Sequence, residues 1–339
     1  MERLTPGDPE EIGGFTLVAR LGSGGMGVVY LARRGIQRVA LKVLNAPLIG
    51  EASHRERFAR EAQSLGQCSS THIASLIDWS VSDREAWLAM EYVNGPNLRE
   101  LVAHTGGLDE RMWFAVLKGV VEGLAELHSM GIIHRDIKPS NIVLSSDGPK
   151  IIDFGISQAL DSTRLTQTGG VEGSPAWLSP DQLELVDFGV ASDLFSLAST
   201  MVFAAGGRSP WGDESTLTIP VVFSRILGWE PDYSRLTPDQ IAVVQPLHEK
   251  NPSARPAAGE VLESLAQIDL GVFRESAWLS VRQQAEDLRA AAPEMSGQQD
   301  GAPDTAAADT FLTGPTETSV KPQPPEDLAT TTRILQPSR

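Results

Sequence analysis

The sequence predicts an α+β chain in which a small β-rich lobe is followed by a larger helical lobe. Strand-like segments punctuated by glycine fill the stretch from Phe15 to Lys42, and helical periodicity dominates from Asn97 onward. The chain has 339 residues, which is too long for one small core and suits two lobes and a tail. With 41% hydrophobic and 21% charged residues, its composition is typical of a soluble globular protein.

The β-rich lobe is expected over residues 13–93, after an N-terminal extension of residues 1–12. Between Phe15 and Lys42, β-branched and aromatic residues alternate with small ones, which predicts strands around a tight loop. An amphipathic helix is expected over Glu51–Gln67, because its apolar side chains share one face and its charges lie opposite. Strand character returns over Ile73–Val93.

The helical lobe is expected over residues 94–270. Asn94-Gly95-Pro96 breaks the chain at its start and predicts a hinge. Residues 271–290 carry a narrow apolar stripe at helical spacing, which indicates a short flanking amphipathic helix. Residues 291–339 are rich in proline, alanine and threonine and contain few large apolar side chains, so a disordered tail is expected there.

A β-hairpin is predicted between the apolar runs Ile142-Val143-Leu144 and Lys150-Ile151-Ile152, with Ser146-Asp147-Gly148 as its turn. Asn141 and Asp153 flank this hairpin, so two oxygen-bearing side chains converge at its open end, about one strand spacing (roughly 4.8 Å) apart. Mg²⁺ prefers such hard ligands, with phosphate oxygens completing its shell. The alternative is that these residues are ordinary turn formers.

Two motifs surround this hairpin: His134-Arg135-Asp136-Ile137-Lys138-Pro139-Ser140-Asn141 and Asp153-Phe154-Gly155. Together they resemble the catalytic core of a protein kinase, which implies the two-lobed protein kinase fold. The resemblance also implies ATP as nucleotide and Mg²⁺ as metal, with Mn²⁺ as the alternative. It assigns Asp136 to orient the substrate hydroxyl and accept its proton, Lys138 to neutralise the transferring phosphoryl group, and Asn141 and Asp153 to hold the metal.

The run Gly22-Ser23-Gly24-Gly25-Met26-Gly27 fits a glycine pattern that dinucleotide-binding enzymes share. In those enzymes the last glycine opens a helix, whereas here Gly27 leads into the strand-like run Val28-Val29-Tyr30-Leu31-Ala32. A glycine-rich turn between two strands lets the backbone lie close over phosphates. The context therefore favours an ATP-binding turn.

Lys42 ends the otherwise apolar segment Val39-Ala40-Leu41-Lys42. By resemblance, Lys42 holds the α- and β-phosphates of ATP and pairs with Glu61. A surface pair between Glu61 and Arg57 is the alternative, and the two pairings are expected to alternate between active and inactive states. By resemblance, Val29 and Ala40 cover the adenine ring, Met90 is the gatekeeper, and Glu91 and Val93 offer backbone groups to the ring edge. Val143 is a further ATP-binding residue by the same resemblance.

Further motifs follow in the order that kinases have them. Gly173-Ser174-Pro175-Ala176-Trp177-Leu178-Ser179-Pro180-Asp181 resembles the substrate-binding loop, and Ser192-Asp193-Leu194-Phe195-Ser196-Leu197 resembles the buried helix behind it. Asn251-Pro252-Ser253-Ala254-Arg255-Pro256 resembles the motif whose arginine pairs with the acid ending that loop. A partly buried ion pair between Asp181 and Arg255 is therefore predicted, although Asp181 is one methylene shorter than the usual glutamate.

The residues of several motifs, such as Met90-Glu91-Tyr92-Val93, are similar to those of bacterial Hanks-type serine/threonine kinases. The resemblance implies a kinase that phosphorylates protein serine or threonine hydroxyls and autophosphorylates Thr166 and Thr168, with Arg135 as the partner of the phosphate. Two alternatives stay open: a pseudokinase scaffold, and a small-molecule phosphotransferase of the antibiotic-kinase type, which Lys138 and the long segment before Asp181 disfavour.

The net charge of −16 disfavours a nonspecific nucleic-acid or membrane binder, and Cys68, the single cysteine, fits a reducing compartment. Met1–Glu11 lacks the apolar core of a signal segment, and no apolar run is long enough to cross a bilayer, so a soluble cytoplasmic protein is expected. The threonines of Thr330–Leu335 resemble sites that FHA modules read when phosphorylated. A homodimer for trans-autophosphorylation is a further expectation.

Overall fold

The computed structural model describes residues 1–25, 27–45, 50–83, 85–154, 175–184, 189–213 and 216–268. Several predictions fall on residues outside this part of the chain: Met26 of the glycine-rich turn, the phosphosites Thr166 and Thr168, the flanking helix of residues 271–290, and the tail. Among the described helices, none is long and apolar enough to cross a membrane.

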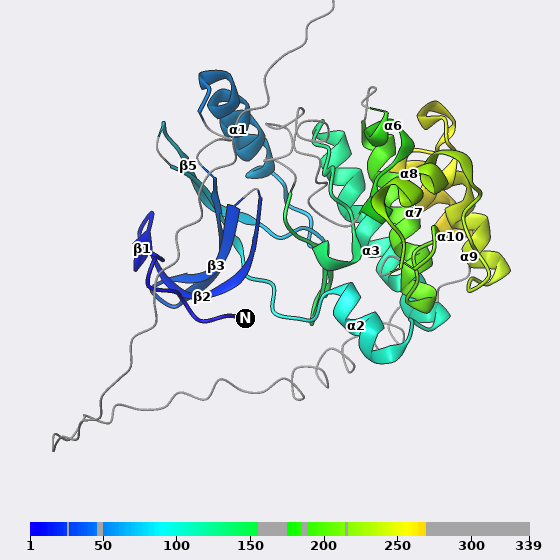
Figure 1. Cartoon of the computed structure of the whole chain (residues 1–339), viewed down its shortest axis with the longest axis horizontal. Coiled ribbons are helices and arrows are strands. Elements are labelled where there is room, and N and C mark those ends of the chain that lie inside the picture. The colour runs from blue at the N-terminus through cyan, green and yellow to red at the C-terminus, as the bar shows by residue number, and fades with distance from the viewer. Residues whose placement is uncertain are drawn as a thin grey trace, which may run out of the picture. The chain divides into compact units, whose positions relative to one another are not determined.

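The first part of the chain forms an antiparallel sheet of six strands in the order β1-β2-β3-β4-β6-β5, with one helix, α1 (Ala52–Leu65), beside it (Figure 1). The strands are β1 (Glu11–Ile12), β2 (Phe15–Gly24), β3 (Gly27–Arg34), β4 (Gln37–Leu44), β5 (Leu76–Val81) and β6 (Ala86–Glu91). The predicted amphipathic character of α1 is confirmed, because Phe58, Ala62 and Leu65 are its buried residues. Phe58 meets Trp79 of β5 edge-on, with ring centroids 6.2 Å apart.

The two faces of this sheet carry different residues, because successive side chains of a strand alternate between faces. Cross-strand register aligns Val29 with Lys42, and Ala40 with Met90, so all four side chains share one face. The opposite face is a separate apolar cluster, which comprises Ile12, Phe15, Leu17, Tyr30, Ala32, Val39, Leu41, Trp87 and Ala89. Ile12 of this cluster comes from the predicted N-terminal extension, and so does Leu4, which packs against the cluster.

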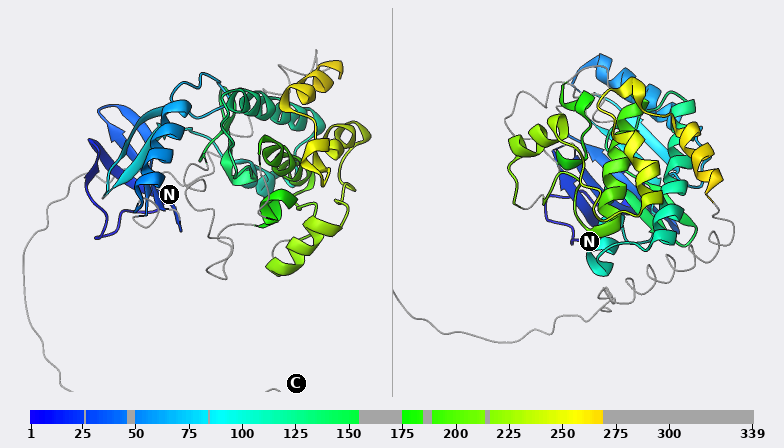
Figure 2. Two further views of the ribbon diagram at one scale, coloured as in Figure 1. Left: turned by 90° about the horizontal axis from the view of Figure 1, so that it is seen from above. Right: turned by 90° about the vertical axis from the view of Figure 1, so that its right-hand side faces the viewer.

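The second part is mainly helical, as predicted, and Figure 2 shows its helices grouped apart from the sheet. The helices are α2 (Leu98–Thr105), α3 (Glu110–Ser129), α6 (Pro180–Leu183), α7 (Val190–Gly206), α8 (Ile219–Gly228), α9 (Pro238–Val244) and α10 (Ala258–Gln267). Short 3₁₀ turns lie between them: η2 (Pro139–Asn141), η3 (Pro175–Trp177), η4 (Gln245–His248) and η5 (Pro252–Ala254). Asn97 starts α2 directly after the predicted hinge, since its side chain and that of Glu100 form a capping box.

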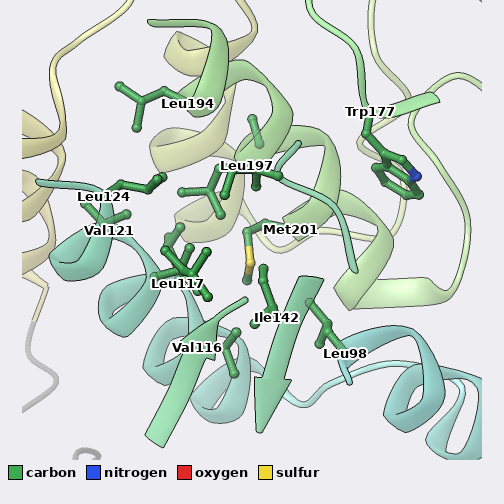
Figure 3. Packing of buried hydrophobic residues seen from close by; sticks show 14 of the residues in the cluster. Leu98, Val116, Leu117, Val121, Leu124, Ile142, Trp177, Leu194, Leu197 and Met201 are labelled. Carbon is green, nitrogen blue, oxygen red and sulfur yellow. The ribbon is translucent and has the colours of Figure 1, made fainter. Parts of the chain in front are cut away.

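Helices α3 and α7 form the centre of the helical part. Leu117, Val121 and Leu124 of α3 lie opposite Leu194, Leu197 and Met201 of α7 (Figure 3). Trp113 of α3, fully buried, donates its indole N–H to the Met201 carbonyl at 2.7 Å. Burying a Leu-sized side chain stabilises a fold by roughly 1.5–3 kcal/mol, so this interface holds α7 firmly in place.

The predicted hairpin is confirmed as β7 (Ile142–Ser145) and β8 (Gly148–Ile151), paired antiparallel. Segments that connect to the sheet border both of its edges. On one edge, the Ile151 N–H donates to the His72 carbonyl at 2.8 Å and the Ala74 N–H donates to the Ile151 carbonyl at 3.0 Å. On the other edge, the Leu144 N–H donates to the Pro96 carbonyl at 2.9 Å.

Candidate active site

The loop before the hairpin is held by one buried carboxylate, Asp193 of α7, whose residue is 1% exposed. Asp193 accepts the backbone N–H groups of His134 and Arg135, each at 2.8 Å, and contacts His128 Nε2 at 2.9 Å. Arg135 has a φ of 67°, which costs a residue with a side chain roughly 1–3 kcal/mol. This conformation persists because Asp193 holds the Arg135 N–H while Gln182 donates to the Arg135 carbonyl at 2.9 Å.

His134 is fully buried beneath this loop. Burial lowers its pKa and keeps the imidazole neutral, although nearby carboxylates act in the opposite direction. Its Nδ1 lies 3.3 Å from the Asp136 backbone N–H and its Nε2 lies 3.1 Å from the Ile152 carbonyl, so Nδ1 accepts and Nε2–H donates. A single tautomer thereby ties Asp136 to Ile152, the residue between β8 and Asp153.

The predicted catalytic residues Asp136, Lys138 and Asn141 are brought together in one hydrogen-bonded cluster. Lys138 Nζ donates to Asp136 Oδ2 at 2.7 Å, and Asn141 Nδ2 donates to the same oxygen at 3.0 Å and to the Asp136 carbonyl at 2.9 Å. The other carboxylate oxygen, Oδ1, receives no hydrogen bond from the described residues. That oxygen can accept a proton from an incoming hydroxyl group.

The predicted metal ligands Asn141 and Asp153 lie at the open end of the hairpin. The Ile152 N–H, next to Asp153, donates to the Asn141 carbonyl at 2.9 Å. Because the Asn141 amide nitrogen is bound to Asp136, its side-chain oxygen is left as a neutral hard donor, and Asp153 supplies an anionic one. This donor set fits Mg²⁺, which takes a few protein oxygens together with phosphates and waters.

Asp153 forms an ion pair with Lys42, a contact that spans the sheet and the hairpin end. The partial removal of Asp153 from water would by itself raise its pKa, but the charge and hydrogen bond of Lys42 outweigh this effect and lower the pKa. Asp153 therefore remains an anion. Its φ of 59° is a second left-handed conformation in this site.

Glu61 of α1 pairs with Arg135, at 3.3 Å between Oε1 and Nη1. The predicted contact between Lys42 and Glu61 is thus not formed in this conformation, because each of the two has another partner. Burial raises the pKa of Glu61, and the Arg135 charge reduces that rise only in part. The Arg135 Nε is also buried, and among the described residues it has no hydrogen-bond acceptor.

The glycine-rich turn follows directly from β2 and leads into β3. Gly24 is paired with Gly27, and Asn45 Nδ2 donates to the Gly25 carbonyl at 2.6 Å. At Gly27 only glycine fits: its φ is 148°, and a Cβ there would lie 1.9 Å from the Val43 carbonyl oxygen. The register Gly22–Val29–Lys42 places the predicted phosphate-binding turn next to the predicted phosphate-binding lysine.

The predicted adenine residues lie on the sheet, on the hairpin and in the connection after β6. Val29, Ala40 and Met90 share the sheet face that also carries Lys42, whereas Val143 lies on β7 and is 6% exposed. Glu91 ends β6, and its carboxylate accepts from Lys150 Nζ at 2.7 and 2.9 Å, so a cation of β8 is tied to the predicted adenine edge. Val93 is half-buried in the connection that follows.

The predicted ion pair between Asp181 and Arg255 is present, and it is fully buried where a partly buried pair was expected. Arg255 Nη2 lies 2.7 Å from Asp181 Oδ1, with side-chain exposures of 0% and 4%. Ser192 Oγ also donates to Asp181. The shorter acid therefore still reaches the arginine, and Asp181 fixes the start of α6, whose N-cap Ser179 forms a capping box with Gln182.

Comparison with known sequence families identifies the chain. The protein kinase domain family matches residues 15–265, which is most of the chain. The chain belongs to the protein kinase family. The fold predicted by resemblance is thereby confirmed, with the sheet as the N-lobe and the helical part as the C-lobe.

Similar curated kinases are bacterial. The chain is 42% identical over 267 residues to the probable serine/threonine-protein kinase PkwA of Thermomonospora curvata, covering 78% of this chain and 36% of that kinase. It is 34% identical over 289 residues to the serine/threonine-protein kinase AfsK of Streptomyces coelicolor, covering 83% of this chain and 36% of that kinase. The chain thus spans about a third of the length of these relatives, and the predicted resemblance to bacterial Hanks-type kinases is confirmed.

No role in the site was assigned from the sequence to three residues that hold it: Asp193, Gln182 and Lys150. Asp193 had a signal, because it is the only charged residue of a largely buried helix, where a charge needs partners. Gln182 and Lys150 had none, since their partners, the Arg135 carbonyl and Glu91, lie 47 and 59 residues away.

Proposed function

We propose that the chain is a serine/threonine protein kinase that transfers the γ-phosphoryl group of Mg-ATP to hydroxyl groups of protein substrates. The observation that carries this proposal is the meeting of Asp136, Lys138 and Asn141 in one cluster beside Asp153 and Lys42. The names of the bacterial relatives support serine/threonine specificity. A cytoplasmic location, FHA-domain readers and homodimerisation, all expected from the sequence, belong to the same proposal.

In this proposal, Mg-ATP supplies the phosphoryl group and the protein supplies position and charge. Asp136 binds the substrate hydroxyl through Oδ1 and accepts its proton, while Asn141 keeps the carboxylate oriented. Lys138, already 2.7 Å from Asp136, lies where it can neutralise charge near that hydroxyl. Asn141 and Asp153 hold the metal, and Lys42 turns from Asp153 to the α- and β-phosphates.

Transfer of ³²P from [γ-³²P]ATP to a generic protein acceptor tests the function. Wild type is expected to label the acceptor on serine and threonine, as shown by phosphoamino-acid analysis, and EDTA is expected to abolish the labelling because it removes the metal. Nucleotide binding without label transfer would instead indicate a pseudokinase scaffold. Labelling of an aminoglycoside but not of protein would indicate a small-molecule phosphotransferase.

We also propose that Arg135 is the point at which activation acts. Arg135 now pairs with Glu61, and its Nε has no acceptor among the described residues. A phosphothreonine carries about −1.5 to −2 charges and can form one to three charge-assisted hydrogen bonds, so it competes with a single carboxylate for the guanidinium. Phosphate on Thr166 or Thr168 thereby releases Glu61, which becomes free to pair with Lys42.

A double variant, Thr166→Ala/Thr168→Ala, is expected to lose most of its specific activity toward an added protein substrate, because nothing then displaces Glu61. Thr163→Ala, in the same segment, serves as the matched control and should retain wild-type activity. Arg135→Ala should make activity insensitive to phosphatase treatment. Full activity of the double variant would show that this switch does not operate.

A further inference from the structure

Residues 1–12 precede the part of the chain that matches the kinase family, yet they are bound to the strand that leads into the glycine-rich turn. Asp8, whose side chain is 3% exposed, is the centre of this contact. Arg20 of β2 donates to it from Nη2 at 2.6 Å and from Nε at 2.8 Å, and the Tyr30 hydroxyl of β3 donates at 2.7 Å. Thr5 adds its backbone N–H at 2.6 Å and its hydroxyl at 2.9 Å.

The backbone of the same segment takes the place of a neighbouring strand. The Glu2 N–H donates to the Arg20 carbonyl, and the Arg20 N–H donates to the Glu2 carbonyl, each at 2.9 Å. Between β2 and β3, the regular register shifts at Leu17/Ala19 and again at Arg20/Gly22. Such irregularities bend a strand and redirect its backbone groups. Here the redirected N–H and carbonyl of Arg20 bind the Glu2 backbone.

The segment is also fixed by packing against the outer face of the sheet. Leu4 and Ile12 contact the apolar cluster that contains Tyr30 and Trp87. Gly13 permits this approach, since its φ is 58° and a Cβ there would lie 2.2 Å from the Trp87 ring. The contact is therefore close and specific.

This contact lies directly behind the phosphate-binding elements. Arg20 is paired with Tyr30, and the next pair along the two strands is Gly22 with Val29, which in turn is paired with Lys42. Because side chains alternate between faces, Tyr30 points to the face opposite that of Val29 and Lys42. Asp8 thus binds the strands directly next to the glycine-rich turn, on the face opposite the proposed nucleotide site.

We propose that residues 1–12 are a positioning element of the kinase domain, in which Asp8, through Arg20 and Tyr30, fixes the glycine-rich turn for ATP. The turn needs such support, because glycines supply no side chains to hold it and leave the backbone with more freedom than other residues. This inference rests on the proposed use of ATP.

The electrostatics of the contact agree with this role. The hydrogen bonds from Arg20 hold the pKa of Asp8 well below its usual range, and burial raises the pKa of Tyr30. Asp8 is therefore an anion and Tyr30 a donor at any pH at which a kinase works. Asp8→Asn removes the charge at nearly constant size, which leaves Arg20 beside a neutral amide and weakens its hydrogen bonds.

The test compares Asp8→Asn with wild type in the full chain. Binding of Mg²⁺ with the non-hydrolysable analogue AMP-PNP is measured by calorimetry, and KM for ATP and kcat are measured separately. Asp8→Asn is expected to raise Kd and KM for ATP by about five- to tenfold and to change kcat less than about twofold, because the lost interaction orients the turn and does not touch reacting atoms. Amides of residues 20–24 should exchange hydrogen faster in the variant.

Two further variants keep the result interpretable. Asp78→Asn breaks the exposed pair with Arg34, 2.7 Å apart on the same sheet, and should leave all of these values unchanged. Tyr30→Phe keeps the pair of Asp8 and Arg20 and removes one hydrogen bond, so it should shift KM for ATP in the same direction but less; it replaces Asp8→Asn if that variant does not fold. Wild-type affinity and exchange in both Asp8→Asn and Tyr30→Phe would overturn the inference, whereas failure of wild type to bind nucleotide would overturn the proposed function instead.

Discussion

Lys42→Met, Asp136→Asn and Asp153→Asn are each expected to reduce phosphoryl transfer by roughly 10²–10³-fold, the cost of removing one group that stabilises charge in a transition state. Each substitution removes a charge from the cluster that the structure brings together at the hairpin end. Transfer of ³²P from [γ-³²P]ATP to a protein acceptor measures the effect. Activity above about a tenth of wild type in any of the three would contradict its assigned role.

Matched substitutions separate this effect from unfolding. Lys118→Met removes a lysine that pairs with Glu122 on the surface of α3, and Asp147→Asn changes an exposed aspartate in the turn between β7 and β8. Both should retain activity close to that of wild type. Thermal unfolding of the active-site variants should change less than that of a variant in a fully buried ion pair, because the Lys42 and Asp153 side chains are only partly withdrawn from water, with exposures of 13% and 34%.

Arg255→Ala is expected to lower the free energy of unfolding by about 3–5 kcal/mol, since it leaves the Asp181 carboxylate buried without its counter-charge. The guanidinium also donates to the carbonyls of Glu249 and Ala191, at 2.7 and 3.0 Å. Arg255→Lys keeps the charge but not this planar set of donors, so its free energy of unfolding should lie between those of wild type and Arg255→Ala. A melting temperature of Arg255→Ala equal to that of wild type would show that the pair has no structural role.

The same pair predicts a dependence on pH. Burial alone would raise the pKa of Asp181, but hydrogen bonds from Arg255 and Ser192 outweigh it and the pKa is lowered. A depressed pKa means that the pair stabilises the fold fully above the pKa of unfolded aspartate, about 3.9, and that this contribution is lost as pH falls through the folded value. The difference in unfolding free energy between wild type and Arg255→Ala should therefore shrink as pH falls and Asp181 becomes protonated, first in the variant, where Arg255 no longer opposes the effect of burial, and then in wild type.

Local patterns predicted much of this site. Alternating apolar runs around Ser146-Asp147-Gly148 were enough to predict the hairpin, because turn chemistry and strand propensity act over a few residues. The pair of Asp181 and Arg255 followed from motif resemblance. The partner of Glu61 did not, because Arg135 and Lys42 are both cations and only the placement of α1 decides between them.

Residues 1–12 also form contacts that the sequence did not predict. They were predicted as an extension because they contain few apolar residues. Their attachment to the sheet includes polar contacts between residues far apart in the sequence, since Asp8 meets Arg20, 12 residues away, and Tyr30, 22 residues away. No local pattern indicates that such distant polar groups meet.

The hairpin of β7 and β8 has a mechanical consequence. Segments that lead to the N-lobe are hydrogen-bonded along both of its edges, at His72 and Ala74 on one side and at Pro96 on the other. Because the N-lobe is connected along both edges of the hairpin, we expect it to rotate most easily about an axis close to the hairpin. Residues near such an axis are displaced least. Asn141, which precedes the hairpin, and Asp153, which follows it, are therefore expected to stay nearly still if the N-lobe turns. The glycine-rich turn and Lys42 are then expected to move relative to the predicted metal ligands, so that closure of the lobes would change the proposed phosphate contacts and leave this ligand pair in place.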